Sequence, residues 1–249
     1  MTTYKDIHGT KVEVRDDDPA NPVNGQVWYN SGTLKGFKSN PVGAWASGAA
    51  LNTGGIFGTQ NGAGTQTAGL VASRLQEAGP SPGQKANTEA YNGSAWTELN
   101  DVNSARNAAA MGGTQTSALL GGGHGGITAN TESWNGTSWT EGNNLNVARR
   151  GIEGFGTQTA AVGVGGFPPP GKKTEEYNGT SWSNGTDFGT VRMNKFGTAG
   201  LEPAGLIFSG SETVNTESYD GSSWTEVNNL SIQRSNGAGL GTQTAALCF

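Results

Sequence analysis

The stretch NTESWNGTSWTEGNNLNVARRGIEGFGTQTAAVGVGG, Asn130–Gly166, is written again with small changes about 43 residues further along the chain. Its most regular element is a tryptophan that recurs at intervals of 43, 43 and 42 residues, as Trp96, Trp139, Trp182 and Trp224. Self-similarity at a fixed period of this size is the signature of a repeat architecture. The repeat therefore decides the fold.

Three further positions keep the same register. An aromatic residue stands five residues before each tryptophan, as Tyr91, Trp134, Tyr177 and Tyr219. A glutamate stands seven residues before it, as Glu89, Glu132, Glu175 and Glu217, and an arginine ten residues after it, as Arg106, Arg149, Arg192 and Arg234. We expect the aromatic residues to pack between neighbouring repeats, and the glutamates and arginines to pair or to cap loop backbone.

Each repeat is predicted to form four short strands. An Asn-Gly or Asp-Gly dipeptide predicts a tight hairpin between the third and fourth strands, at Asn135-Gly136, Asn178-Gly179 and Asp220-Gly221. The phrase GTQT, which begins at Gly113, Gly156 and Gly241, predicts a turn between two strands of small residues that suit a crowded central axis. No segment keeps a 3.6-residue apolar period, so helices are not expected. Four strands in 40–50 residues are typical of a β-propeller blade.

The last repeat stops after two strands, at Thr242–Phe249. Residues 33–249 number 217, or about 43 for each of five blades. We expect Thr33–Lys38 and Ala44–Gly48 to supply the missing strands, with Phe37 and Trp45 as their aromatic pair, and to close the ring. The expected domains are an N-terminal attachment segment, residues 1–32, and a five-bladed β-propeller, residues 33–249.

The loops between the second and third strands differ from repeat to repeat. They are Ser73–Ala86, His124–Ala129, Phe167–Lys173 and Ser211–Val214. Because binding residues often lie on loops held by a rigid scaffold, we take this loop face as the candidate binding site. The candidate residues are Arg74, Gln76, His124, Phe167, Lys172 and Lys173. The alternative is that these loops vary because nothing constrains them.

Composition and charge exclude several classes of function. The chain has 42 glycines, but its seven Trp, eight Phe and five Tyr argue against disorder. A net charge of −5 gives no basis for binding nucleic acid. No apolar run of 18 residues predicts a membrane span, and the opening residues do not resemble a secretory signal. A single cysteine excludes an internal disulfide framework.

No motif for catalysis, cofactor binding or metal binding is found. His8 and His124 stand in separate regions, and Cys248 lies in an apolar strand. The run Asp16–Asp18 is predicted to be a solvated turn and not a calcium site, because no spaced ligands follow it. We therefore expect a protein that is not an enzyme.

Two features carry a family resemblance. Apolar strands that end in a glycine doublet, Gly121-Gly122 and Gly165-Gly166, and are followed by the aromatic pair resemble the kelch family of β-propellers. The phrase NPVNGQVWYNSGTLKGF, Asn21–Phe37, is similar to a segment of virion proteins of marine tailed phages. In those proteins it often precedes kelch-like repeats with the same NGTSWTE and GTQTAA phrasing.

The resemblance implies a non-enzymatic phage virion protein: part of a tail, nozzle or fibre, or a head decoration. Such a protein would be made in the host cytoplasm, contact other virion proteins and assemble as a homo-oligomer in the particle. Strands expected at Lys11–Arg15 and Gln26–Asn30 would form an anchoring arm that adds to a neighbour's sheet, or would pack on the chain's own propeller. The alternative function is a lectin-like propeller that binds host surface glycans for attachment, with aromatic and Asn/Asp side chains recurring as pockets between blades.

Overall fold

The computed structural model describes residues 4–7, 10–18, 20, 27–30, 33–36, 47–55, 62–77, 83–168, 171–193, 196–210, 213–234 and 237–248. The chain forms two compact units, Met1–Ser47 and Gly48–Phe249. Every regular element in these residues is a β-strand, as expected from the lack of a helical apolar period. The protein is therefore an all-β protein in the part described.

The first unit contains one sheet with the strand order β1-β2-β3-β4. Its strands are β1 (Tyr4–Ile7), β2 (Thr10–Arg15), β3 (Val27–Asn30) and β4 (Thr33–Gly36). The β2–β3 pair is parallel, and the other two pairs are antiparallel. The strands predicted at Lys11–Arg15 and Gln26–Asn30 are thus found as β2 and β3.

Asp18 connects the turn after β2 to the two strands that follow it. Its carboxylate accepts hydrogen bonds from Trp28 Nε1 at 2.9 Å and Asn30 Nδ2 at 2.7 Å, and it pairs with Lys35 Nζ at 3.2 Å. The bonds from Asn30, Trp28 and Lys35 lower the pKa of Asp18 to about 2. The acidic run was predicted as a solvated turn; the structure gives its last member a specific role in this sheet.

The second unit contains four four-stranded antiparallel sheets, called blades 1 to 4, and a two-stranded sheet, called the half-blade. Blade 1 holds β5 (Gly62–Thr65), β6 (Ala68–Gln76), β7 (Gly83–Tyr91) and β8 (Trp96–Leu99). Blade 2 holds β9 (Ala110–Thr114), β10 (Ser117–Gly121), β11 (Thr131–Trp134) and β12 (Trp139–Glu141). Blade 3 holds β13 (Glu153–Gly156), β14 (Ala161–Val164), β15 (Thr174–Tyr177) and β16 (Trp182–Asn184). Blade 4 holds β17 (Gly197–Leu201), β18 (Ala204–Phe208), β19 (Thr216–Tyr219) and β20 (Trp224–Val227), and the half-blade holds β21 (Gly239–Thr242) and β22 (Ala245–Cys248).

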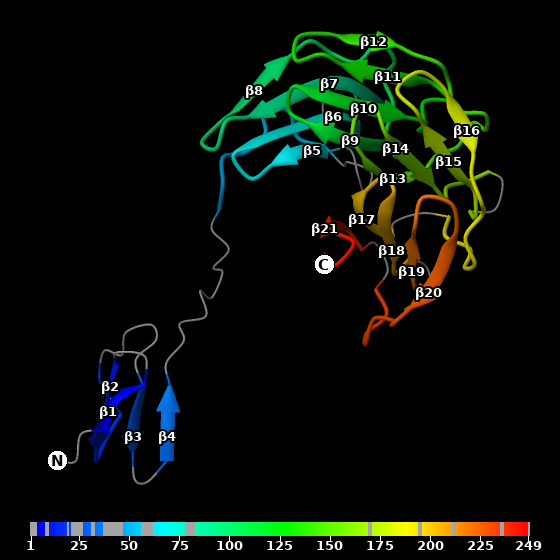
Figure 1. Cartoon of the computed structure of the whole chain (residues 1–249). Coiled ribbons are helices and arrows are strands. Elements are labelled where there is room, and N and C mark those ends of the chain that lie inside the picture. Colours follow the sequence, from blue (N-terminus) through cyan, green and yellow to red (C-terminus); the bar gives the residue numbers. More distant parts are fainter. Residues whose placement is uncertain are drawn as a thin grey trace. The chain divides into compact units, whose positions relative to one another are not determined.

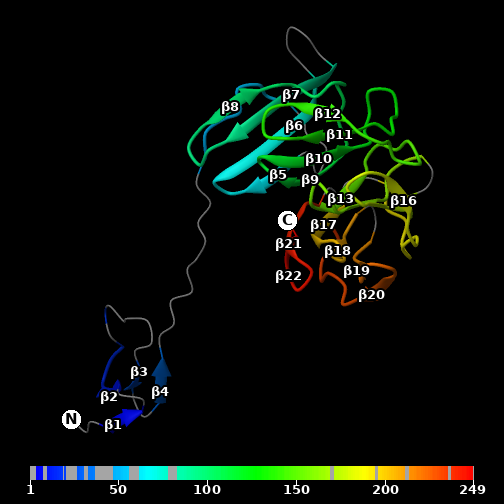
Figure 2. The same cartoon turned by 45° about the horizontal axis from the view of Figure 1, so that its top comes forward.

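Neighbouring blades meet through their first strands. β5 contacts β9, β9 contacts β13, β13 contacts β17, and β17 contacts β21. In Figures 1 and 2 these first strands lie on the inner side of a curved array, and the fourth strands lie on its outer side. The arrangement is a β-propeller-like repeat, as the sequence predicts.

The turn between the third and fourth strands contains the predicted Asn-Gly or Asp-Gly dipeptide within a loop of four residues. In blade 2, Trp134 pairs directly with Trp139, so four residues, Asn135–Ser138, form the turn. The Asn135 side-chain oxygen accepts bonds from the amides of Thr137 and Ser138, both at 2.9 Å. Gly136 has the expected positive φ of 91°. The Asn-Gly signal therefore predicted the place of the turn and the role of its glycine, while the asparagine acts as a cap.

Tryptophan side chains join each blade to the one before it. The indole Nε1 donates to a threonine Oγ1 on the third strand of the preceding blade. These bonds are Trp139 to Thr88 at 2.9 Å, Trp182 to Thr131 at 3.0 Å and Trp224 to Thr174 at 3.0 Å. Within each blade the tryptophan ring also contacts the aromatic ring five residues earlier, with centroids 4.7–5.3 Å apart.

The GTQT glutamines form a second connection between blades. Gln158 Nε2 in blade 3 donates to the carbonyl oxygens of Ala118 and Trp134 in blade 2, at 3.2 and 2.5 Å. Gln115 joins blade 2 to blade 1 in the same way, and Gln243 joins the half-blade to blade 4. The turn itself requires glycine, since Gly156 has a φ of 119° and a Cβ there would lie 2.3 Å from the Ala160 oxygen.

Replacing Gln158 with alanine is expected to lower the free energy of unfolding by about 1–3 kcal/mol, because two carbonyl groups between blades lose their donor. Chemical denaturation measures this loss. The matched control is Gln233→Ala, because Gln233 is exposed and its replacement should change stability by less than about 0.5 kcal/mol. Equal effects of the two variants would contradict the inter-blade role.

The expected ring closure through Thr33–Lys38 requires a correction. Leu34 lies opposite Tyr29 in the β3–β4 ladder and does not pair with β22, and the half-blade sheet contains β21 and β22 alone among the strands described. β3 and β4 are joined by two residues, so their hairpin forms at a far smaller loop-closure cost than a pairing across the chain. The expected boundary at residue 32 accordingly differs from the observed units, which place β4 in the first. Phe37 and Trp45 lie outside the described residues.

Candidate functional site

The face made by the second-to-third-strand loops and the blade-to-blade connections is called the loop face. Backbone bonds tie its loops to the connections. His124 and Asn107 exchange two bonds, with N–O distances of 2.7 and 3.0 Å, and Phe167 and Arg150 exchange two more, at 2.8 and 2.9 Å. The loop face is therefore held by the scaffold beneath it.

A buried arginine–glutamate pair lies under this face in each of blades 2, 3 and 4. The pairs are Arg106–Glu132 at 3.0 Å, Arg149–Glu175 at 2.8 Å and Arg192–Glu217 at 2.6 Å. Each glutamate also accepts a backbone amide of the connection that enters its blade, from Asn103, Asn146 and Gly189 respectively. Burial lowers the pKa of the three guanidinium groups, and the paired glutamates oppose that shift. The predicted pairing and capping roles are confirmed for these residues.

Arg74 was predicted as an exposed loop residue, and the structure places it in the scaffold instead. It is buried on β6 and pairs with Glu89 at 3.1 Å. Gly55 stands ten residues after Trp45, where the other repeats have their arginine. A Cβ on Gly55 would lie 2.7 Å from Cδ of Arg74, so the Arg74 side chain runs through the space next to Gly55. Blade 1 thus obtains its cation from its second strand, whereas blades 2 to 4 obtain theirs from the connection that enters the blade.

The loop expected at Ser73–Ala86 is mostly strand. β6 and β7 continue as a ladder as far as Gln76, which pairs with Gly83, after an irregularity at Ser73. Gln76 is therefore a half-buried ladder residue. On the same side of the molecule, Gln84 Nε2 lies 3.3 Å from His124 Nδ1, so the side chain of His124 is held by the extended hairpin.

Three candidate residues of the loop face differ in their exposure and in their partners. They are Phe167, Lys172 and Lys173. Phe167 is 39% exposed, and Lys172 is half-buried. Lys173 pairs with Asp187 at 2.9 Å, and its carbonyl accepts a bond from Arg149. Sequence reasoning missed three exposed apolar residues of the same loops and connections: Ile127, Val191 and Met193. Single apolar residues in variable segments have no pattern that would identify them.

Glu153 is a buried carboxyl group that sequence reasoning also missed. It is fully buried at the start of β13, directly opposite Val164, and neither carboxyl oxygen has a hydrogen-bond partner in the described structure. Burial raises its pKa well above the usual value for glutamate. The corresponding residue of blade 2 is Ala110, because each stands three residues before the first glycine of the GTQT turn. The signal available in the sequence was a glutamate at a position where blade 2 has alanine.

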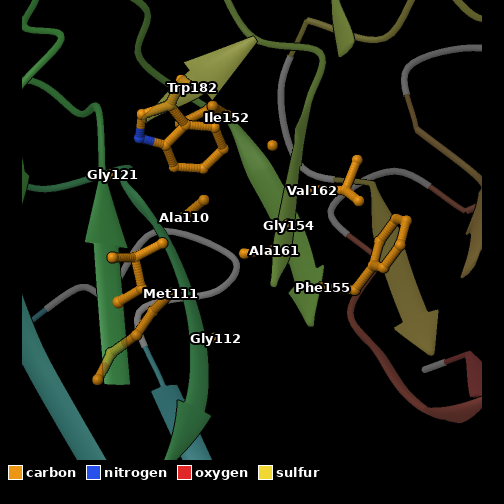
Figure 3. A pocket seen from close by; sticks show the side chains of 12 residues that line it. Ala110, Met111, Gly112, Gly121, Ile152, Gly154, Phe155, Ala161, Val162 and Trp182 are labelled. Atoms are coloured by element: carbon orange, nitrogen blue, oxygen red, sulfur yellow. The ribbon is translucent and has the colours of Figure 1, made fainter. Parts of the chain in front are cut away.

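An apolar cavity lies between blades 2 and 3 (Figure 3). It contains about 290 Å³ of empty space, part of which is open to solvent, and its lining includes Ala110, Gly112, Ile152 and Trp182. No lining residue is ionisable. The cavity offers shape and dispersion contacts, with no side chain for acid–base chemistry.

The origin of the cavity is a difference between equivalent residues. Phe155 stands just before the turn glycine of blade 3, and its ring packs toward blade 4, where a Cβ on Gly205 would lie 2.1 Å from Cζ. Gly112 holds the equivalent position in blade 2. The interface of blades 2 and 3 therefore lacks the ring that fills the interface of blades 3 and 4.

Within the described segments, no group of three or more His, Cys, Asp or Glu side chains is placed to hold a metal ion. No helix in those segments is long and apolar enough to cross a membrane. Cys248 is a free, half-buried thiol on β22, and burial raises its pKa.

The sequence was compared with protein-family models and with curated proteins, and neither comparison found a match.

Proposed function

We propose that this chain is a non-enzymatic structural component of a tailed-phage virion, in which a five-bladed kelch-like propeller acts as a rigid interaction scaffold. The main support is how the repeated residues are used. In the blades, the repeated glutamates, arginines, tryptophans and glutamines bind other parts of the array. Chemistry that recurs in every blade therefore serves rigidity, and the differences between blades are concentrated in the loops.

The phrase Asn21–Phe37 supports the virion setting through its similarity to phage particle proteins. Its residues include β3 and β4, which belong to a sheet separate from the blades. In the proposal, this first unit attaches the protein to the particle and the loop face contacts neighbouring virion proteins. β4 is the last strand in its sheet order, so it offers an edge to which a neighbour's strand can add.

The lectin alternative receives less support from the aromatic residues. Glycan stacking requires an accessible ring face, but Trp134, Trp139, Tyr177, Trp182 and Tyr219 are all buried. Their positions between and within blades identify them as packing residues in the fold. A glycan site would have to use other side chains.

Mass spectrometry of purified phage particles tests the proposal. We expect the chain in the particles at a fixed ratio to the capsid protein, because structural components are incorporated in set copy numbers. Infected-cell lysate serves as the control for expression. If the chain is abundant in the lysate and absent from the particles, the virion proposal fails.

Changing the loop face should impair docking without affecting the fold. We expect the double variant Phe167→Ser, Lys172→Ser to keep its stability within about 0.5 kcal/mol, because neither side chain is buried. We expect its incorporation into particles to fall. Leu201→Ser is the matched control, since Leu201 is an exposed apolar residue beside the first-to-second-strand turn of blade 4, away from the loop face. Equal incorporation of all three proteins would exclude the loop face as the docking surface.

A further inference from the structure

The half-blade has an open sheet edge along β22 (Figure 2). β22 pairs with β21 and with no other strand of the described residues, whereas the second strand of each of blades 1 to 4 also pairs with a third. All four residues of β14 in blade 3 are buried, and none of the four in β22 is. The sequence of β22, AALC, contains no charged residue and no proline, which are the usual means of keeping an edge strand from pairing. The edge is therefore suited to accept another strand.

Arg234, at the entry to the half-blade, lacks the carboxylate that its counterparts have. Its carbonyl oxygen accepts a bond from the Gly210 amide at 3.3 Å, as that of Arg192 does from the Gly166 amide at 3.2 Å. Arg192 is buried and pairs with Glu217 on the third strand of its blade. Arg234 is exposed, and no carboxylate of the described residues pairs with it. The missing carboxylate belongs to the third strand that the half-blade lacks.

The strand register places such a carboxylate next to Arg234. In blade 3, Glu175 lies opposite Gly163, which stands seven residues after the first glycine of GTQT. Cys248 holds this position in the half-blade. Burial raises the pKa of Cys248, and the charge of Arg234 opposes that rise, so the guanidinium group lies near this thiol. A glutamate opposite Cys248 on an added strand would therefore face Arg234.

A buried hydroxyl group at the end of blade 4 calls for an indole from the strand after that. Thr131 and Thr174 each accept a bond from a tryptophan on the fourth strand of the following blade, at 3.0 Å. Thr216 is their equivalent in blade 4, and its Oγ1 is buried without a hydrogen-bond partner in the described structure. The two strands of the half-blade contain no tryptophan. The carboxylate and the indole stand on one hairpin of the repeat, the one that joins the third and fourth strands.

We propose that the half-blade is a docking site for a β-hairpin of a different protein, which pairs with β22, places a glutamate against Arg234 and donates an indole N–H to Thr216 Oγ1. Main-chain hydrogen bonds supply the affinity of strand addition, and the two side-chain contacts supply its specificity. The corresponding hairpins of blades 1 to 4 are already paired in their own sheets, so a second copy would have to unfold a blade to supply one. The inference adds a second docking surface to the proposed function, and it depends neither on the loop face nor on the virion setting.

A synthetic peptide with the sequence of residues 214–227, VNTESYDGSSWTEV, is the probe, because it carries Glu217 and Trp224 at the spacing of the repeat. Calorimetric titration of the full-length chain measures its Kd. We expect Glu217→Gln in the peptide and Arg234→Gln in the protein each to weaken binding about tenfold, because each removes one partner of the ion pair. The two changes together should cost little more than either alone. Arg150→Gln is the matched control, since Arg150 is also exposed and its replacement should leave the Kd unchanged.

Cys248 gives a second measurement, because it is the only cysteine of the chain and is half-buried on β22. An added strand should slow alkylation of its thiol by iodoacetamide. The proposal is overturned if no peptide binds, if the glutamine peptide binds as tightly as the glutamate peptide, or if bound peptide does not slow alkylation. It is also overturned if the thiol is protected without peptide, either in the monomer, where the same chain would cover β22, or only in a dimer detected by light scattering, where a second copy would do so. None of these outcomes depends on whether the protein is found in particles.

Discussion

Replacing Glu153 with glutamine is expected to stabilise the protein by about 1–3 kcal/mol at pH 8, because glutamine removes the cost of protonating the buried carboxyl group or of burying its charge. Glu153 is fully buried, its carboxyl oxygens have no hydrogen-bond partner in the described structure, and burial raises its pKa well above the usual value. At pH 8 the unfolded chain carries a solvated carboxylate. The folded chain must hold a proton on Glu153 or bury its charge, and glutamine avoids both penalties.

The sign of the pH dependence follows from the raised pKa. The folded state binds the proton of Glu153 more tightly than the unfolded state does, so this group favours folding fully below the unfolded pKa of about 4.3. That contribution is lost as the pH rises toward the folded pKa. The stability difference between Glu153→Gln and the wild type should therefore grow from pH 5 to pH 8, by at most about 1.4 kcal/mol per pH unit.

Urea denaturation at several pH values measures this difference. Glu77→Gln removes the same charge from an exposed position and should give a nearly constant difference from the wild type over the same pH range. A Glu153→Gln difference that does not change with pH would mean that Glu153 is solvated or paired in solution.

Breaking the Arg149–Glu175 pair is expected to have the largest destabilising effect. Both side chains are fully buried, and Arg149 also donates to the carbonyl groups of Gly165 and Lys173. Arg149→Met leaves the Glu175 carboxylate buried without its cation, and Glu175→Gln leaves the guanidinium without its anion. Each single change should cost about 3–5 kcal/mol, as measured for other buried pairs that lose one partner.

The double variant Arg149→Met, Glu175→Gln separates charge from packing. It contains no buried charge at this place, so its loss of stability should be clearly smaller than the sum of the two single losses. Thermal and chemical denaturation of the four proteins complete the double-mutant cycle. Strictly additive losses would show that the two charges do not interact. The exposed pair Lys173–Asp187 is the control, with a coupling below about 1 kcal/mol.

The repeat made much of the fold predictable from the sequence. Four copies of one pattern predicted the four strands, the turns at GTQT and Asn-Gly, and a pairing or capping role for the repeated arginines and glutamates, because each copy obeys the same local geometry. The pattern could not predict Arg74, because this arginine does not stand at the repeat position and reaches Glu89 through the space that Gly55 leaves next to it.

Two other features were misread or missed for physical reasons. β4 was assigned to the propeller because its residues suit a strand, but strand propensity does not choose a partner, and the short connection to β3 does. The cavity between blades 2 and 3 depends on which interface lacks an aromatic ring, and that follows from packing across blades. Glu153 was the exception: a glutamate at the position where blade 2 has Ala110 could have been noticed.

The indole and glutamine contacts between blades all run in one direction along the chain. Trp139 and Gln158 each donate to groups on the blade that was synthesised before their own. As the polypeptide leaves the ribosome, every new blade therefore meets acceptors that are already folded, and none has to wait for residues still untranslated. Such vectorial growth avoids long-lived exposed intermediates, because each new sheet finds its partners in the neighbouring blade as soon as it folds.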